Sequence, residues 1–158
     1  MLNNKKSIIC INKKAQYSYY IKDVYYSGLV LKGWEVKSLR FKKVDISNAY
    51  ISIINNEFFL INSTINVLPI INTFTDINIK RKRKLLLKKM EIKFLSLALK
   101  KKGITCIALS LFWKNNWCKL KFALSQGKKK IDKRFKIKQN DWKIDKMRLQ
   151  KKNFKKIT

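Results

Sequence analysis

Histidine is absent from this chain of 158 residues, and glycine, proline and acidic side chains are scarce. Without histidine, the commonest general base and the commonest nitrogen ligand for metals are missing, and every histidine-dependent catalytic triad is excluded. The nine acids lie far apart in sequence and most neighbour a lysine, which favours surface salt bridges over a catalytic carboxylate pair. No Gly-x-x-x-x-Gly-Lys loop for nucleotide phosphates is present. We therefore predict a binding protein with no cofactor or metal, and not an enzyme.

Cysteine is also sparse, and long hydrophobic runs are missing. Cys10, Cys106 and Cys118 are widely spaced and form no Cys-x-x-Cys pair, which argues against a disulfide framework and a zinc site and favours buried reduced thiols. No run approaches the ~18 apolar residues of a membrane-spanning helix. Met1–Lys6 lacks the apolar core of a signal peptide. These features predict a soluble cytoplasmic protein with no membrane partner.

Positive charge is what the chain has in excess. It carries 38 lysines and arginines against 9 acids, a formal net charge of +29. The abundance of Lys, Ile and Asn is typical of an AT-rich genome, which explains why lysine outnumbers arginine but not why acids are so few. A compact chain of this charge repels itself unless a polyanion neutralises it. Charge therefore predicts a nucleic-acid partner, without distinguishing RNA from DNA.

Alternating apolar and polar residues predict several short strands. The expected strands are Ser7–Ile11, Gly33–Arg40, Ala49–Ile54, Phe58–Asn62, Ile104–Trp113 and Trp117–Leu124. In the second of these, the alternation places Glu35, a candidate buried carboxylate, on the face opposite Trp34. Asn55-Asn56 and Lys114–Asn116 predict the turns of two hairpins, because asparagine tolerates the positive φ that short hairpin turns need.

One long helix is expected from Lys84 to Lys102, where Gly103 ends it. Its inward stripe is expected to comprise Leu87, Met90, Phe94, Leu97 and Ala98. The segment Pro69–Ile79 has no clear period and leads into the basic run Lys80–Lys84. Short strands around one helix, with a last hairpin, predict a mainly β fold with some α: a small β-barrel of the oligonucleotide-binding type with flanking helices.

The composition changes at Gly127, so we expect a barrel domain over residues 1–127 and a basic tail over residues 128–158. In the tail, Phe135, Trp142 and Leu149 are seven residues apart and can share one helical stripe. So few apolar residues do not offset the entropy of ordering the segment. We therefore predict a tail that is disordered when free and folds as a basic helix along RNA.

Five blocks of residues, in order along nearly the whole chain, resemble the SsrA-binding proteins, also called small protein B. The blocks are Asn12–Ala15 with Tyr19, Gly33–Arg40, Arg83–Leu87, Ala108–Asn115 with Trp117–Lys119, and Gly127–Arg134. The resemblance implies a bacterial ribosome-rescue factor that binds the tRNA-like domain of transfer-messenger RNA (SsrA RNA) and enters stalled ribosomes with it. In that reading the barrel takes the place of an anticodon arm, and the tail occupies the empty mRNA channel near the decoding centre.

The resemblance also assigns roles to single residues. The RNA-binding residues would be Asn12, Lys13, Tyr19, Lys37, Arg40, Lys119, Lys128 and Lys129. The tail residues that contact the ribosome would be Asp132, Lys133, Arg134, Trp142, Asp145, Lys146 and Arg148. The protein would act as a monomer, with elongation factor Tu as a further partner. A structural protein of the small ribosomal subunit, with a similar barrel and tail, is the alternative.

Two positions depart from the family pattern. The family commonly has an acid just before the equivalent of Gly28, where this chain has Tyr25, Tyr26 and Ser27. A histidine or tyrosine ring usually precedes the Asp-Lys-Arg block, where this chain has Ile131. Isoleucine can neither stack on a base nor donate a hydrogen bond, so its chemistry at this position differs from that of the family.

Overall fold

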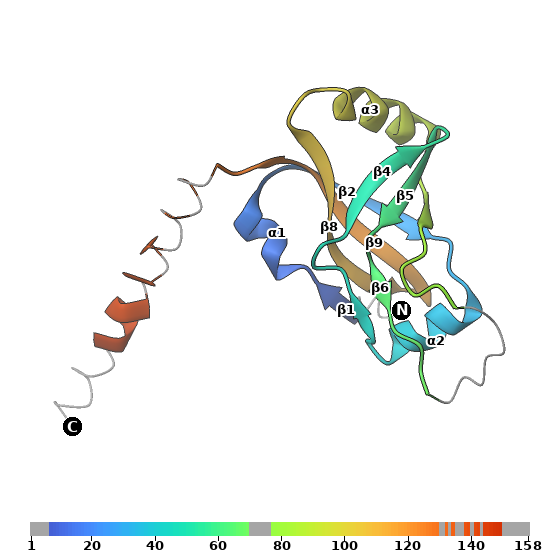
Figure 1. Ribbon diagram of the computed structural model, residues 1–158, viewed down its shortest axis with the longest axis horizontal. Coiled ribbons are helices and arrows are strands. Elements are labelled where there is room, and N and C mark those ends of the chain that lie inside the picture. The colour runs from blue at the N-terminus through green and yellow to red at the C-terminus, as the bar shows by residue number, and fades with distance from the viewer. Residues whose placement is uncertain are drawn as a thin grey trace, which may run out of the picture. The chain divides into compact units, whose positions relative to one another are not determined.

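The computed structural model describes residues 7–69 and 77–129 and, in the tail, residues 132, 134, 138, 139, 141, 142 and 144–149. The chain divides into two compact units, Met1–Gly127 and Lys128–Thr158. The first unit is mainly β sheet with a few short helices, as the sequence predicts (Figure 1). Among the described residues, no helix is long and apolar enough to cross a membrane.

In the described part of the first unit, seven antiparallel strands form one sheet in the order β1-β8-β4-β5-β7-β2-β9. They are β1 (Ser7–Ile11), β2 (Tyr19–Leu29), β4 (Tyr50–Ile54), β5 (Glu57–Ile61), β7 (Arg83–Leu86), β8 (Ile104–Lys114) and β9 (Trp117–Gly127). In addition β8 pairs with β9, which links the second strand of this order to the last. The helices and the small second sheet are α1 (Lys13–Ser18), α2 (Gly33–Arg40), α3 (Lys89–Leu99), β3 (Val44–Asp45) and β6 (Thr64–Ile65).

Both predicted hairpins are confirmed. Asn55 and Asn56 join β4 to β5 with φ of 50° and 61°, and Asn115 and Asn116 join β8 to β9 with φ of 49° and 64°. Asparagine adopts this left-handed region more readily than most residues because its short polar side chain can hydrogen-bond locally. The turn residues alone therefore identify where these two strand pairs reverse.

The alternation predicted for the return strand of the second hairpin is also confirmed. Leu120, Phe122 and Leu124 of β9 are buried in the core, whereas Lys119 and Lys121 point to the other face. Cys106 and Cys118 are buried free thiols, as predicted, and burial raises the pKa of each to about 12. Cys10 is half-buried. Thiols of such high pKa are inert packing groups at neutral pH.

The prediction of a strand at Gly33–Arg40 is wrong, because these residues form helix α2. Glu35 begins the helix by accepting a hydrogen bond from the Lys32 N–H at 2.7 Å. Glu35, Ser38 and Leu39 are buried. Ser38 and Leu39 follow Glu35 by three and four residues, so this segment of eight residues satisfies a helical period as well as strand alternation. Burial of Glu35 itself is confirmed.

The predicted start of the long helix is also wrong. Arg83–Leu86 is strand β7, which pairs with β5 and β2, and α3 begins only at Lys89. The Glu91 carboxylate accepts a hydrogen bond from the Lys88 N–H at 2.9 Å and so caps the helix there. Strand β7 pairs with β5 on one side and β2 on the other, and this pairing outweighs the helical propensity of its residues.

The predicted inward stripe of this helix is correct only in part. Leu95 is fully buried, and Ile92, Ala98 and Leu99 pack against the core. Met90, Phe94 and Leu97 instead face solvent, with exposed fractions of 80%, 54% and 57%. Two apolar stripes run along α3, and contact with the sheet selects one of them as the inner face.

Candidate nucleic-acid interface

Asn12 begins α1 and holds it on the sheet. Its Oδ1 accepts a hydrogen bond from the Ala15 N–H at 3.1 Å, and its Nδ2 donates to the carbonyl oxygens of Ile46 and Ala108 at 3.1 and 3.0 Å. The residue is buried, and both polar atoms of its side chain are engaged within the chain. The side chain of Asn12 therefore positions α1 from within the unit, and its contact with RNA stays a prediction.

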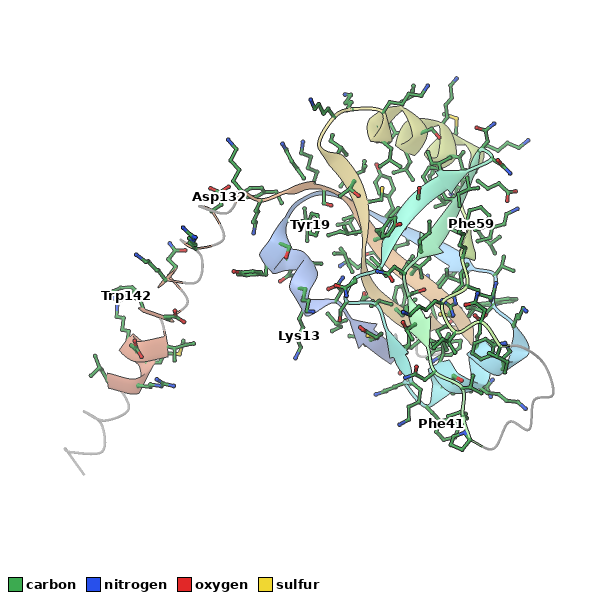
Figure 2. All side chains as sticks on the ribbon, viewed as in Figure 1. Lys13, Tyr19, Phe41, Phe59, Asp132 and Trp142 are labelled. Carbon is green, nitrogen blue, oxygen red and sulfur yellow. The ribbon has the colours of Figure 1, made fainter. Side chains whose placement is uncertain are left out.

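Lys13 and Tyr19 lie at opposite ends of α1 (Figure 2). Lys13 is exposed, and Tyr19 is half-buried at the start of β2. Beside α1 lies a pocket of about 310 Å³ with a mixed polar and apolar lining. Its lining comes from α1, from residues 47–50 and from β8. The segments that Asn12 links by hydrogen bonds therefore also line this pocket, which lies close to the exposed Lys13.

Lys37 and Arg40 are exposed in the last turn of α2. Cations there interact favourably with the carbonyl end of the helix dipole, which is a sufficient structural reason for both. Figure 1 shows α1 and α2 well apart on the first unit. The predicted RNA-binding residues of the two helices therefore form two separate groups.

On the outer face of the sheet, the Tyr26 ring of β2 lies beside lysines of β9, a placement that the sequence did not predict. In the strand register, Lys121 lies opposite Tyr26 of β2, and Lys119 lies opposite Gly28 of β2 and Phe112 of β8. The Tyr26 ring is 53% exposed and meets Phe112 edge-on, with centroids 6.1 Å apart. An exposed ring flanked by lysines can stack on an unpaired base while the cations contact phosphates.

Sequence reasoning singled out Lys119 but did not select Tyr26, although it noted that an aromatic stands where the family has an acid. The missing information was the register between β2 and β9, two strands that are almost 100 residues apart and that include a bulge between Ile21 and Val24. A bulge shifts the alternation by one residue, so the outward face of β2 could not be followed from its start.

A buried ion cluster joins α2 to the segment that enters β7. The Glu35 carboxylate is fully buried and accepts hydrogen bonds from Nε of Arg81 at 2.9 Å and from Nε of Arg83 at 2.8 Å, as well as from Nη2 of Arg81. Arg83 is also fully buried and donates to the carbonyl oxygen and hydroxyl of Ser63, both at 2.7 Å, and to the carbonyl oxygen of Ile79 at 2.9 Å.

Burial alone raises the pKa of Glu35, but hydrogen bonds from Arg81 and from the Lys32 N–H, together with the charges of Arg83 and Arg81, outweigh it. The pKa of Glu35 therefore lies below its usual value, and the carboxylate is charged at neutral pH. Sequence reasoning placed both arginines in the basic run Lys80–Lys84 and did not predict their pairing with Glu35. One signal was available: Glu35 is one of only nine acids in the chain and stands between the apolar residues Trp34 and Val36.

The predicted tail residues that the structure describes are exposed or half-buried, and several of them make local contacts within the tail. Asp132 accepts a hydrogen bond from the Lys129 N–H at 3.2 Å, and Asp145 pairs with Arg148 at 3.4 Å. The Lys146 ammonium lies 5.2 Å from the centre of the Trp142 ring. The described residues from 132 to 149 are helical.

Other tail predictions remain open. Lys133 and Ile131 lie outside the described residues. Lys128 is half-buried, Lys129 and Arg134 are exposed, and their roles stay predictions, as does disorder of the free tail. Within the described ranges, no three Cys, Asp or Glu side chains gather to hold a metal ion. The candidate interface therefore consists of exposed lysines and arginines together with exposed aromatic rings.

Comparison with known proteins gives consistent matches over both units. Residues 9–152 match the family described as SmpB protein. The SsrA-binding protein of Buchnera aphidicola subsp. Schizaphis graminum (strain Sg) is 52% identical over 149 residues, which cover 94% of this chain and 91% of that protein. The SsrA-binding protein of Buchnera aphidicola subsp. Baizongia pistaciae (strain Bp) is 45% identical over 141 residues, 89% of each chain.

A solved structure matches the fold as well. It is described as "tmRNA-SmpB: a journey to the center of the bacterial ribosome". The two chains superpose with a TM-score of 0.63 and are 34% identical, and the match covers 77% of this chain and 85% of the other.

Proposed function

Because this chain belongs to the SmpB family, we propose that it is an RNA-binding adaptor of trans-translation. It binds the tRNA-like domain of transfer-messenger RNA and delivers it to stalled ribosomes. The observation that carries this proposal is the family match over residues 9–152, which includes the tail as well as the sheet. The alternative, a structural protein of the small subunit, finds no support among these relatives. The adaptor needs no catalytic group, and we infer that it is not an enzyme.

We infer that the RNA-binding face lies on the first unit. Lys13 contributes from α1 and Tyr19 from the start of β2, and Lys119 and Lys121 flank the Tyr26 ring on the sheet. Lys37 and Arg40 add positive charge from α2. Cations contact the phosphate backbone and set the orientation of the RNA, whereas exposed rings stack on unpaired bases. Asn12 and the cluster around Glu35 act indirectly, because they position these elements.

We also infer the finer architecture. The pairing of β8 with both β4 and β9 supports a small barrel of the oligonucleotide-binding type. The basic tail, from Lys128 onward, occupies the empty mRNA channel, where its exposed cations meet ribosomal RNA. A net charge of +29 opposes self-association, which supports a monomer. The protein works in the cytoplasm, and elongation factor Tu is a further candidate partner.

Binding of the tRNA-like RNA is expected to weaken steeply as salt increases. If about six or more phosphates are contacted at ~0.7 released counterions each, the plot of log affinity against log salt has a slope on the order of −4 or steeper. Fluorescence anisotropy with labelled RNA over a KCl series measures the slope. A duplex RNA of equal length serves as a control for nonspecific attraction. A slope near zero would contradict an electrostatic interface.

Asn12 and Lys13 are adjacent, but substitutions at the two positions are expected to have different effects on stability and RNA binding. Lys13→Ala should weaken RNA binding several-fold without changing the melting temperature, since the side chain is exposed. Asn12→Ala should lower the free energy of unfolding by about 1–3 kcal/mol, because it removes a helix cap and leaves buried groups without partners. Thermal melting and RNA titration separate the two effects, with the exposed Lys102→Ala as a matched control. Equal melting of the Asn12 variant and the native chain would rule out the positioning role.

A further inference from the structure

Helix α3 carries an apolar stripe that the core does not use. Met90, Phe94 and Leu97 recur at spacings of four and three residues and are 80%, 54% and 57% exposed. They extend over about 10 Å of helix, since each residue rises ~1.5 Å. The inner face is already complete, because Leu95 is fully buried there. We refer to Met90, Phe94 and Leu97 as the outer stripe of α3.

Phe94, in the middle of the outer stripe, is held in place from one side. Its ring lies 6.5 Å from that of Tyr25 on β2, and Tyr25 in turn stacks on the buried Phe122 at 5.7 Å. A ring that is already ordered loses less conformational entropy when a partner covers it. Aromatic residues in such positions are typical anchors of protein interfaces.

A row of cations borders the outer stripe. Lys89, Lys93 and Lys100 are exposed and lie together on one side of it at helical spacing. Glu91 is the only acid between Lys89 and Leu99, and it is used in capping the helix. The outer stripe of α3 therefore lies beside a row of lysines with uncompensated positive charge.

The apolar side chains of the outer stripe and the lysines beside it indicate which kind of partner binds this surface. RNA would use the lysines but gain little from the aliphatic side chains of Met90 and Leu97, which cannot stack on bases. A second copy of this chain is disfavoured, because both molecules carry 38 basic and only 9 acidic residues. A lipid surface requires a larger apolar face than three side chains on a helix whose other side is covered by the sheet.

We propose that the outer stripe of α3 docks an acidic, amphipathic helix of a partner protein. Apolar side chains of that helix cover Met90, Phe94 and Leu97, and its carboxylates face Lys89, Lys93 and Lys100. Spacings of three and four residues are those by which a helix presents anchors to a groove or to another helix. Opposite charges then set the orientation and accelerate the encounter.

The docking surface is separate from the parts of the proposed RNA-binding face that lie on α1 and α2. Figure 1 shows α3 at the opposite end of the first unit from α2 and apart from α1. The adaptor can therefore hold RNA and a protein partner at the same time. This inference goes beyond the proposed function and does not depend on it.

A designed peptide tests the surface. The probe is a fluorescent helical peptide with leucine at i, i+4 and i+7 and glutamate along one flank, and the control is a scrambled peptide of the same composition. The full chain should bind the amphipathic peptide at least tenfold more tightly than the scrambled one. The double variant Phe94→Ala with Leu97→Ala should abolish this difference, as should Met90→Glu, which alters a side chain exposed enough to leave the fold intact.

Matched controls make the result specific. Ile11→Ala removes an equally exposed apolar side chain from β1 and should not alter peptide binding. Met90→Glu should retain the native melting temperature, and all the α3 variants should retain the native affinity for the tRNA-like RNA. Because RNA binding is measured separately, failure here leaves the proposed function untouched.

Several outcomes would overturn the proposal. If both peptides bind equally tightly, net charge alone explains the binding. If the variants bind the amphipathic peptide as tightly as the native chain does, the binding site is not the outer stripe. Stronger binding to phosphatidylglycerol vesicles than to the peptide, lost in Met90→Glu, would assign the stripe to lipid. Weaker RNA binding by the α3 variants would assign it to RNA. A dimer in sedimentation that the variants dissolve would assign it to a second copy.

Discussion

A chain that ends at Gly127 is expected to bind the tRNA-like RNA with only a modest loss and yet to be unable to rescue stalled ribosomes. Among the described residues, the buried core lies before Gly127, so the first unit is expected to retain its sheet and helices. The described tail side chains are largely exposed, with Trp142 at 64% and Leu149 at 62%, and so are available to a partner rather than used in folding. RNA titration and a reconstituted tagging reaction on ribosomes without a stop codon measure the two properties side by side.

Smaller changes in the tail should give the same separation of binding from rescue. Replacing Asp132, Lys133 and Arg134 together with alanine should leave RNA affinity nearly unchanged and strongly reduce tagging. Trp142→Ala with Leu149→Ala should weaken the ribosome step by removing the apolar stripe of the helix. If the chain ending at Gly127 rescues ribosomes as well as the full chain does, the tail is only a solvated charged segment.

Glu35→Ala is expected to lower the free energy of unfolding by about 3–5 kcal/mol, the usual cost of removing one partner from a buried ion pair. The substitution leaves the fully buried Arg83 without its carboxylate. Glu57→Ala is the matched control, because Glu57 pairs with Lys84 at the surface, where both side chains are more than 40% exposed. That pair should contribute only about 0–1 kcal/mol. Urea unfolding of the three proteins measures the difference.

The effect of Glu35 should also depend on pH in a defined direction. Its pKa in the folded protein is lowered, so its contribution to stability is complete above the ordinary glutamate pKa of about 4.3 and is lost as the pH falls through the lower value. The difference between the native chain and Glu35→Ala should therefore be constant near neutral pH and shrink in acid. A Glu35 variant as stable as the Glu57 variant at neutral pH would contradict this account.

The sequence by itself determined the features that depend on neighbouring residues or on composition. The asparagine pairs predicted both hairpin turns, and the alternation in Trp117–Leu124 predicted which side chains are buried. The charge balance predicted a polyanionic partner, and five ordered blocks indicated the family. The turn and strand predictions are confirmed because a turn needs only its own φ angles and a strand face only its own period.

Only the tertiary structure decided the features that depend on contacts between distant residues. Eight residues at Gly33–Arg40 fit two periods, and the partners that select the helix for Glu35 lie 46 and 48 residues away at Arg81 and Arg83. The sheet decided which apolar stripe of α3 is buried, and the register of β2 against β9 brought Tyr26 beside Lys121. Local propensity differs by less than about 1 kcal/mol per residue between such alternatives, whereas burying one apolar side chain contributes about 1.5–3 kcal/mol, so packing makes the choice.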